Sequence, residues 1–225
     1  MNIKIGTVYF LRILLILSTI YLILKQDYPF AFISMVATLL AFAPVLINWK
    51  YKVNLPWSIE FLIAFILYMH IFGAALDLYD KIYLWSPLMH FLLTALTALL
   101  AFIIVYTLNL TKQVKISNFM IGFFTVIFSL AIGALWEILE FAIDSNLGTH
   151  LQSDFGLPAI VDTMWDLIWD GIAGIFVALI GTSLVKGYHE LVHPFEMLIK
   201  KIFKKSKEKI RKITKPDKIK KAEKD

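Results

Sequence analysis

Residues 118–142 read NFMIGFFTVIFSLAIGALWEILEFA, with no charged side chain before Glu137. A helix needs about 20 predominantly apolar residues to cross the hydrocarbon core of a bilayer. This stretch meets that requirement, and five other stretches of the chain do so as well. The sequence therefore predicts an all-α membrane protein with six transmembrane helices, at about residues 7–24, 30–48, 57–76, 86–108, 118–142 and 162–185.

The overall composition excludes a soluble fold. Of the 225 residues, 59% are hydrophobic and only 17% are charged, whereas a soluble domain is about 45–50% apolar and about 25% charged. A soluble protein of this size cannot bury so much apolar surface, so soluble enzymes, disordered chains and secreted disulfide scaffolds are excluded. The chain has no cysteine, which leaves carboxylate and imidazole groups for metal binding or acid–base chemistry.

Positive charge is distributed unevenly along the chain, and its distribution predicts the orientation. The first 185 residues hold 8 Lys+Arg and 11 Asp+Glu, whereas residues 186–225 hold 14 and 6. With six spans, both termini and the lysine-bearing loops 49–56 and 109–117 lie on one side, and cytoplasmic loops are typically rich in lysine and arginine. We therefore predict a multi-pass cell-membrane protein with both termini cytoplasmic, in which residues 1–185 form the transmembrane domain and residues 186–225 a basic tail.

In the tail, apolar residues recur at helical spacing among lysines, at Phe195, Leu198, Ile199, Ile202 and Phe203. The pattern predicts an amphipathic helix over residues 195–214 that lies on the inner leaflet of the lipid bilayer and binds anionic lipid. The alternative is a solvated, lysine-rich tail that only fixes the topology. Because the basic charge lies next to a membrane, we expect no nucleic-acid partner, and no feature of the sequence defines an oligomeric state.

Ionisable residues within the spans gather at one side of the membrane. Charged groups inside a bilayer are costly, so they indicate function. Three acidic residues lie in and just after the last turns of the fifth span, three lie in the first turns of the sixth, and the third and fourth spans each have a histidine: Glu137, Glu140, Asp144, Asp162, Asp166, Asp170, His70 and His90. At about 100° per residue, each acidic set shares one helix face. We therefore expect the two acidic faces to meet in the outer half of the membrane.

This set of residues predicts a divalent metal site, although the identity of the metal stays open. The expected ligands are His90, Glu137, Glu140, Asp162 and Asp166, and the expected catalytic residues are Glu140, Asp166 and Asp170. Mixed imidazole and carboxylate ligands suit zinc, manganese or iron, and oxygen ligands alone suit magnesium or calcium. Asp144 and Asp162 also fit a structural role at helix ends.

Three functions are compatible with these residues. The first is a metal-dependent hydrolytic or transfer reaction on a lipid-linked or envelope substrate. The second is a cation- or proton-coupled transporter that uses the same carboxylates, and the third is an envelope scaffold whose charges are structural. A transporter needs a second polar path from the cytoplasm, and only Arg12 and Glu60 are charged within the inner ends of the spans. The scarcity of such residues favours the enzyme.

Four motifs occur in order within residues 79–181. They are Tyr79-Asp80-Lys81 with His90, Trp136-Glu137-Ile138-Leu139-Glu140-Phe141, Gly148-Thr149 with Gln152, and Val161-Asp162-Thr163-Met164-Trp165-Asp166-Leu167 with Asp170 and Gly174. Together they resemble the YjdF-like family of predicted multi-pass prokaryotic membrane proteins, which implies a membrane location but no activity. Asp80 and Lys81 are predicted to bind substrate. The acidic residues of the last span also give a looser similarity to VanZ-like membrane proteins.

A competing motif lies after the last span. His189-Glu190-Leu191-Val192-His193 fits the His-Glu-x-x-His pattern of zinc peptidases. Pro194 follows at once, and only a lysine-rich tail lies beyond it. Because a motif without its structural context is weak evidence, a pair of interfacial histidines is the favoured interpretation.

Overall fold

The computed structural model describes residues 3–187 and 189–213, which form helices and no strand. In chain order the elements are α1 (Ile3–Leu24), α2 (Tyr28–Ala41), α3 (Ala43–Tyr51), α4 (Trp57–Ala75), α5 (Leu78–Lys81), α6 (Trp85–Leu110), α7 (Asn118–Leu147), the 3-10 turn η1 (Asp154–Gly156), α8 (Ala159–Gly187) and α9 (His189–Ile213). Within the described residues, six segments are long and apolar enough to cross a membrane, and α2 and α3 together form the second of them. The prediction of an all-α protein with six spans is therefore confirmed.

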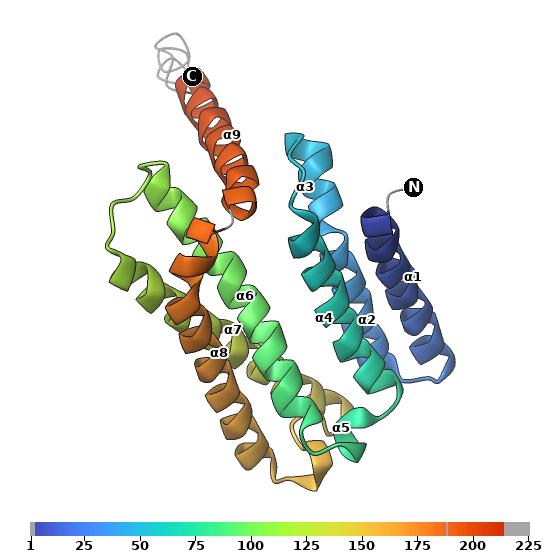
Figure 1. The fold of residues 1–225 in the computed structure, drawn as a ribbon. Coiled ribbons are helices and arrows are strands. Elements are labelled where there is room, and N and C mark those ends of the chain that lie inside the picture. The colour runs from blue at the N-terminus through green and yellow to red at the C-terminus, as the bar shows by residue number, and fades with distance from the viewer. Residues whose placement is uncertain (1–2, 188, 214–225) are drawn as a thin grey trace, which may run out of the picture.

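The six spans form two groups of helices (Figure 1). Helices α1, α2 and α4 pack together in one group and α6, α7 and α8 in the other, while contacts between α4 and α6 join the groups. Helix α1 begins and α9 ends at the same end of the bundle, which we call the terminal end. The short helix α5 and the loop before α8 lie at the opposite end, which we call the α5 end.

The second span is broken at Phe42, and a buried arginine satisfies the backbone there. Pro44 has no N–H to donate, and a new helix, α3, starts one residue before it. Arg12 of α1 is buried, and its Nε donates to the carbonyl of Ala41 at 2.9 Å. The same guanidinium lies 3.0 Å from Glu60 Oε2 of α4. These contacts hold α1, α2 and α4 together in the half of the bundle nearer the terminal end.

Helices α7 and α8 extend three or more residues further towards the α5 end than the sequence predicts. Helix α7 continues past residue 142 to Leu147, where Gly148 ends it with a φ of 66°, a conformation that glycine adopts readily. Helix α8 begins at Ala159 instead of residue 162. Asp144 accepts two backbone hydrogen bonds from the loop that follows α7. The carboxylate of Asp144 is therefore hydrogen-bonded to the loop and not exposed to lipid. For this reason the helix continues past residue 142 although it contains a charged residue there.

Helix α9 begins at His189, before the predicted start at residue 195, and part of its apolar face packs on the bundle. Phe195 and Ile199 are buried, and Phe195 belongs to a core shared with α4, α6, α7 and α8. Lys201 Nζ donates to the carbonyl of Tyr51 at 2.8 Å. The bundle thus covers the first part of the predicted lipid-binding stripe, and binding of this helix to anionic lipid stays a prediction.

Candidate metal centre

Side chains of three helices meet inside the group formed by α6, α7 and α8, towards the α5 end. His90 of α6 lies among the carboxylates of Glu137 on α7 and of Asp166 and Asp170 on α8. We call these four residues the carboxylate–histidine cluster. The three acidic residues have exposed fractions of 5%, 3% and 0% in that order. This arrangement matches the prediction that the acidic faces of the fifth and sixth spans meet.

Three atoms of the cluster are close enough to share one metal ion. His90 Nε2 lies 3.8 Å from Glu137 Oε1 and 3.5 Å from Asp166 Oδ2, and the three atoms all lie within 4.8 Å of one another. Ligands at about 2.1 Å from a tetrahedral ion are about 3.4 Å apart, so small side-chain shifts would allow chelation. Glu137 Oε1 is also buried without a hydrogen-bond partner among the described residues, although buried polar atoms nearly always have one.

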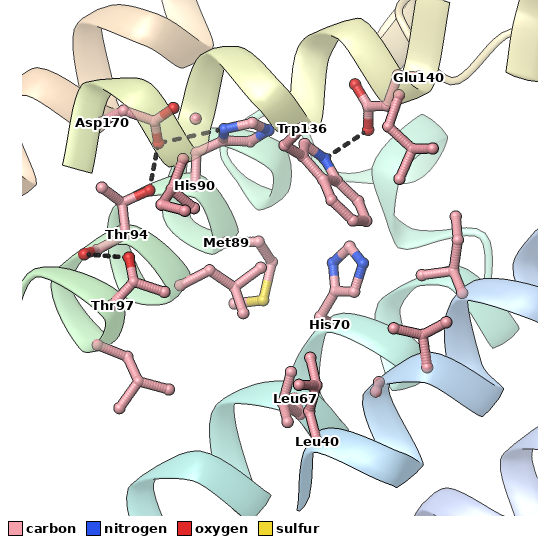
Figure 2. Close-up of a pocket in the computed structure, with 18 of the residues that line it drawn as sticks. Leu40, Leu67, His70, Met89, His90, Thr94, Thr97, Trp136, Glu140 and Asp170 are labelled. Carbon is pink, nitrogen blue, oxygen red and sulfur yellow. Dashed lines mark hydrogen bonds and ion pairs between the residues drawn. The ribbon is translucent and has the colours of Figure 1, made fainter. Parts of the chain in front are cut away.

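Asp170 contacts the other nitrogen of the His90 ring (Figure 2). Its Oδ1 lies 3.4 Å from His90 Nδ1 and accepts a hydrogen bond from Thr94 Oγ1 at 2.5 Å. A carboxylate at the second ring nitrogen is the usual means of orienting a metal-binding histidine. Gly133 of α7 faces this carboxylate, and a side chain at that position would overlap it. The arrangement fits a positioning role for Asp170.

Two hydroxyl groups outside the predicted set of site residues hold the ligand carboxylates. Thr163 Oγ1 donates to Glu137 Oε2 at 2.7 Å, and Ser86 Oγ donates to Asp166 Oδ1 at 3.4 Å. A spacing signal for Ser86 was present, because it precedes His90 by four residues and so lies on the same face of α6. Polar residues at intervals of four in an apolar span therefore indicate the lining of such a site.

Two predicted ligands lie beside the cluster and not in it. Glu140 accepts a hydrogen bond from Trp136 Nε1 at 2.8 Å, and Figure 2 shows it apart from the histidine of the cluster. Asp162 is buried, and its Oδ2 accepts the backbone N–H of Asp154 at 2.8 Å. Among the described residues, the group of ligand atoms that lie close together includes neither Glu140 nor Asp162.

Asp80 and Lys81, the predicted substrate-binding residues, lie on α5 at the same end of the bundle. Both side chains are exposed. Lys81 Nζ donates to the carbonyl of Leu76 at 2.7 Å and lies 3.5 Å from Asp77 Oδ2. Neither residue lines the two cavities that adjoin the cluster, so their binding of substrate stays a prediction.

Two cavities adjoin the cluster. The larger, of about 380 Å³, lies between the two helix groups, with His90 and Glu140 in its wall. The smaller, of about 220 Å³, lies at the α5 end and is lined partly by Asp166. Ser86 and Asp154 line both cavities. The cluster can therefore be approached from two sides.

Near the two cavities, Asp154 and Tyr79 lie outside the spans and have shifted pKa values. Burial raises the pKa of Asp154 to about 7, and the negative charge of Asp162 adds to the shift. Burial also raises the pKa of Tyr79 well above its ordinary value of 10.0, and the Tyr79 hydroxyl is hydrogen-bonded to His70 Nδ1. Asp154 is thus close to its titration midpoint at neutral pH and is suited to proton transfer beside both cavities.

The His-Glu-x-x-His motif lies far from this site. Glu190 and His193 belong to α9 at the terminal end, and Pro194 lies inside that helix. The side chain of His189 is outside the part of the chain that the structure describes. The motif and the carboxylate–histidine cluster therefore lie towards opposite ends of the bundle (Figure 1).

Comparison with known proteins places the chain among membrane proteins. A family described as predicted membrane protein (DUF2238) matches residues 7–187. An uncharacterised protein of Thermotoga maritima is 30% identical over 122 residues, which are 52% of this chain and 58% of that protein. The matched part of the chain thus spans less than two thirds of that relative. No solved structure matches the chain.

The family match covers most of the chain, including the first span from residue 7 onward, the other five spans in full and all four residues of the cluster. It confirms the resemblance to a family of predicted membrane proteins, whereas the similarity to VanZ-like proteins stays a prediction. The chain therefore belongs to the DUF2238 family of predicted membrane proteins.

Proposed function

We propose that His90, Glu137 and Asp166 bind a divalent metal ion, and that this centre catalyses hydrolysis or group transfer on a lipid-linked or envelope substrate. One observation carries the proposal: an imidazole nitrogen and two carboxylate oxygens lie within 4.8 Å of one another at a largely buried site. A mixed set of nitrogen and oxygen ligands suits zinc, manganese or iron.

The residues around the ligands have separate roles in this proposal. A bound ion would polarise a phosphoryl or carbonyl oxygen of the substrate or activate a water molecule. Asp170 holds the His90 ring through Nδ1, so that Nε2 stays directed at the other two ligands. Glu140 lines the larger cavity and is held by Trp136, which makes it the candidate general base. Asp154, with a pKa of about 7, is suited to return the proton.

Two observations favour this enzyme over the alternatives. A transporter would need a second polar path from the terminal end. Arg12 and Glu60, the charged pair between α1 and α4 in that half of the bundle, instead bind each other, and Arg12 also binds the carbonyl of Ala41. A purely structural scaffold is expected to satisfy its buried polar atoms. Glu137 Oε1 and Asp170 Oδ2 instead have no hydrogen-bond partner among the described residues.

The metal content of the purified protein tests the proposal. We expect the full chain, purified in detergent without chelators, to hold about one zinc, manganese or iron ion per molecule, as in a mononuclear site. Glu137→Gln and Asp166→Asn each remove one anionic ligand while keeping the size of the side chain, so both variants should lose the ion. Mass spectrometry of the metal provides both its amount and its identity.

His193→Ala is the matched control, because it removes an imidazole from the competing motif at the opposite end of the bundle. This variant should retain the ion. Loss of metal from His193→Ala, with retention in Glu137→Gln, would move the centre to α9. If no sample contains metal and none takes up added Zn²⁺, Mn²⁺ or Fe²⁺, the proposal is wrong.

We also infer that the terminal end faces the cytoplasm. The lysines of the loops at that end support this orientation, which would place the basic tail beside anionic lipid of the inner leaflet. Because the chain has no cysteine, single cysteines at the exposed positions Gln113 and Ser145 can report the side on which each lies. A membrane-impermeant maleimide should label position 145 but not position 113 in intact cells, and the reverse pattern would contradict the inference.

A further inference from the structure

The larger cavity is apolar along most of its length and polar at one end. Leu40 of α2 and Leu67 of α4 line the apolar part, whereas His90, Glu140 and Asp170 lie at the opposite end (Figure 2). All five residues belong to membrane-spanning segments. The medium around this cavity in the membrane is therefore hydrocarbon.

The rim of the cavity lies between α2 and α7. Both helices line the cavity, yet among the described helices their backbones do not lie close together. Phe32 and Leu40 of α2 are 52% and 53% exposed, and Leu139 of α7 is 38% exposed, although all three line the cavity. Side chains that line a cavity and are also exposed form its edge. The edge is thus apolar and faces the lipid.

Two residues in the wall of the cavity each have one buried atom without a hydrogen-bond partner among the described residues. These atoms are Asp170 Oδ2 and His70 Nε2. A buried polar atom without a partner is unfavourable, and a ligand with a hydroxyl group can supply one. The cavity therefore suits an occupant that is apolar along its length and hydrogen-bonding at one end.

We propose that the larger cavity binds one hydrocarbon chain of a membrane lipid, which enters between α2 and α7 and places a hydroxyl-bearing polar group beside His90 and Asp170. This inference rests on the proposed function and names its substrate class, an amphiphile taken directly from the bilayer. The volume of about 380 Å³ lies near the lower limit of the roughly 300–1,000 Å³ that is usual for ligand pockets. It suits one chain and not two.

Photo-labelling with a lipid tests the proposal. The full chain is placed in nanodiscs of phosphatidylcholine that contain phosphatidylglycerol with a diazirine in one acyl chain, and labelled residues are mapped by mass spectrometry. Label should reach Ala37, which lines the cavity and is buried from the surrounding lipid. Thr97→Phe adds a ring to the apolar part of the cavity. It should lower the labelling of Ala37 about tenfold, the loss expected when about two chain methylenes leave the cavity.

Ala131→Phe is the matched control, because it adds the same ring on the exposed face of α7. It should leave the labelling of Ala37 unchanged. The proposal is overturned if the label in the wild-type protein reaches only exposed side chains, or if Thr97→Phe labels Ala37 as strongly as the wild type does. If the unfolding temperature shows that Thr97→Phe does not fold, the labelled residues of the wild-type protein alone test the proposal.

The metal content of the same samples separates this proposal from the metal centre. Bound metal without labelling of the cavity would overturn only the lipid proposal. Labelling of the cavity without any bound metal would overturn only the metal centre.

Discussion

Replacing Asp170 with asparagine should weaken metal binding at the carboxylate–histidine cluster while keeping the fold. Asparagine preserves the size of the side chain and the Oδ1 acceptor that Thr94 and His90 contact, but it removes the negative charge. Loss of a carboxylate behind a metal-binding histidine typically lowers metal affinity about 10- to 100-fold. The substitution therefore tests whether Asp170 acts on the metal through His90.

The geometry places the expected effect near the lower limit of that range. Asp170 Oδ1 and His90 Nδ1 are 3.4 Å apart, which is longer than the roughly 2.7–2.9 Å of a strong charge-assisted hydrogen bond. We expect a rise in Kd of about tenfold, equivalent to about 1.4 kcal/mol. Thr94→Val, which removes the hydroxyl that holds Asp170, should also raise Kd, but by less than Asp170→Asn does, because the carboxylate behind His90 remains.

Isothermal titration of the chelator-stripped protein with Zn²⁺ and Mn²⁺ measures these constants, and Glu137→Gln serves as the variant that loses a ligand. The absorption spectrum of the cobalt-substituted protein provides an independent signal, because rotation of the His90 ring alters the coordination. A Kd within about twofold of the wild-type value and an unchanged cobalt spectrum in Asp170→Asn, with binding still lost in Glu137→Gln, would refute the positioning role.

Three further changes test other parts of the structure. Arg12→Ala leaves the Glu60 carboxylate without its buried partner and should lower the free energy of unfolding by about 3 kcal/mol, and thermal unfolding close to that of the wild type would contradict this. Gly133→Ala adds a methyl group that overlaps the Asp170 side chain and should cost about 1–3 kcal/mol and weaken metal binding, whereas Gly122→Ala, which meets its neighbour at an ordinary 3.5 Å, should do neither. Lys25 lies 2.9 Å from half-exposed Asp77 and lowers the pKa of that carboxyl. The Lys25–Asp77 ion pair therefore stabilises the fold above about pH 4, and this stabilisation is lost as the pH falls further. The contribution is below about 1 kcal/mol at this exposure, and the difference between wild type and Asp77→Asn should shrink steadily as the pH is lowered below about 4.

The spans could be predicted from the sequence because the bilayer demands a minimum length of apolar residues in each of them. The differences lie at the ends of helices. Helix α7 continues to Leu147 because the Asp144 carboxylate is hydrogen-bonded to the following loop and so is satisfied without water. The meeting of the acidic faces was also predictable, since polar residues on neighbouring spans avoid hydrocarbon by facing each other.

The residues that share the site could not be predicted in the same way. Glu137 and Glu140 are three residues apart on α7, and helical spacing separates them by only about 60°. Glu137 Oε1 nevertheless lies 3.8 Å from His90 Nε2, whereas Glu140 binds Trp136. The rotation of α7 and its close approach to α8 decide which of the two glutamates reaches His90. Both depend on contacts such as that of Gly133 with the side chain of Asp170.

The sequence by itself determined that this protein spans a membrane six times and that its ionisable residues gather towards one end. Both follow from the polarity and the position of each residue along the chain, without knowledge of how the helices pack. Only the tertiary structure decided that His90, Glu137 and Asp166 meet within 4.8 Å and that a cavity of about 380 Å³ adjoins them. The physical reason is that both features depend on how helices distant in the chain rotate and pack against one another, which small residues at the contacts control.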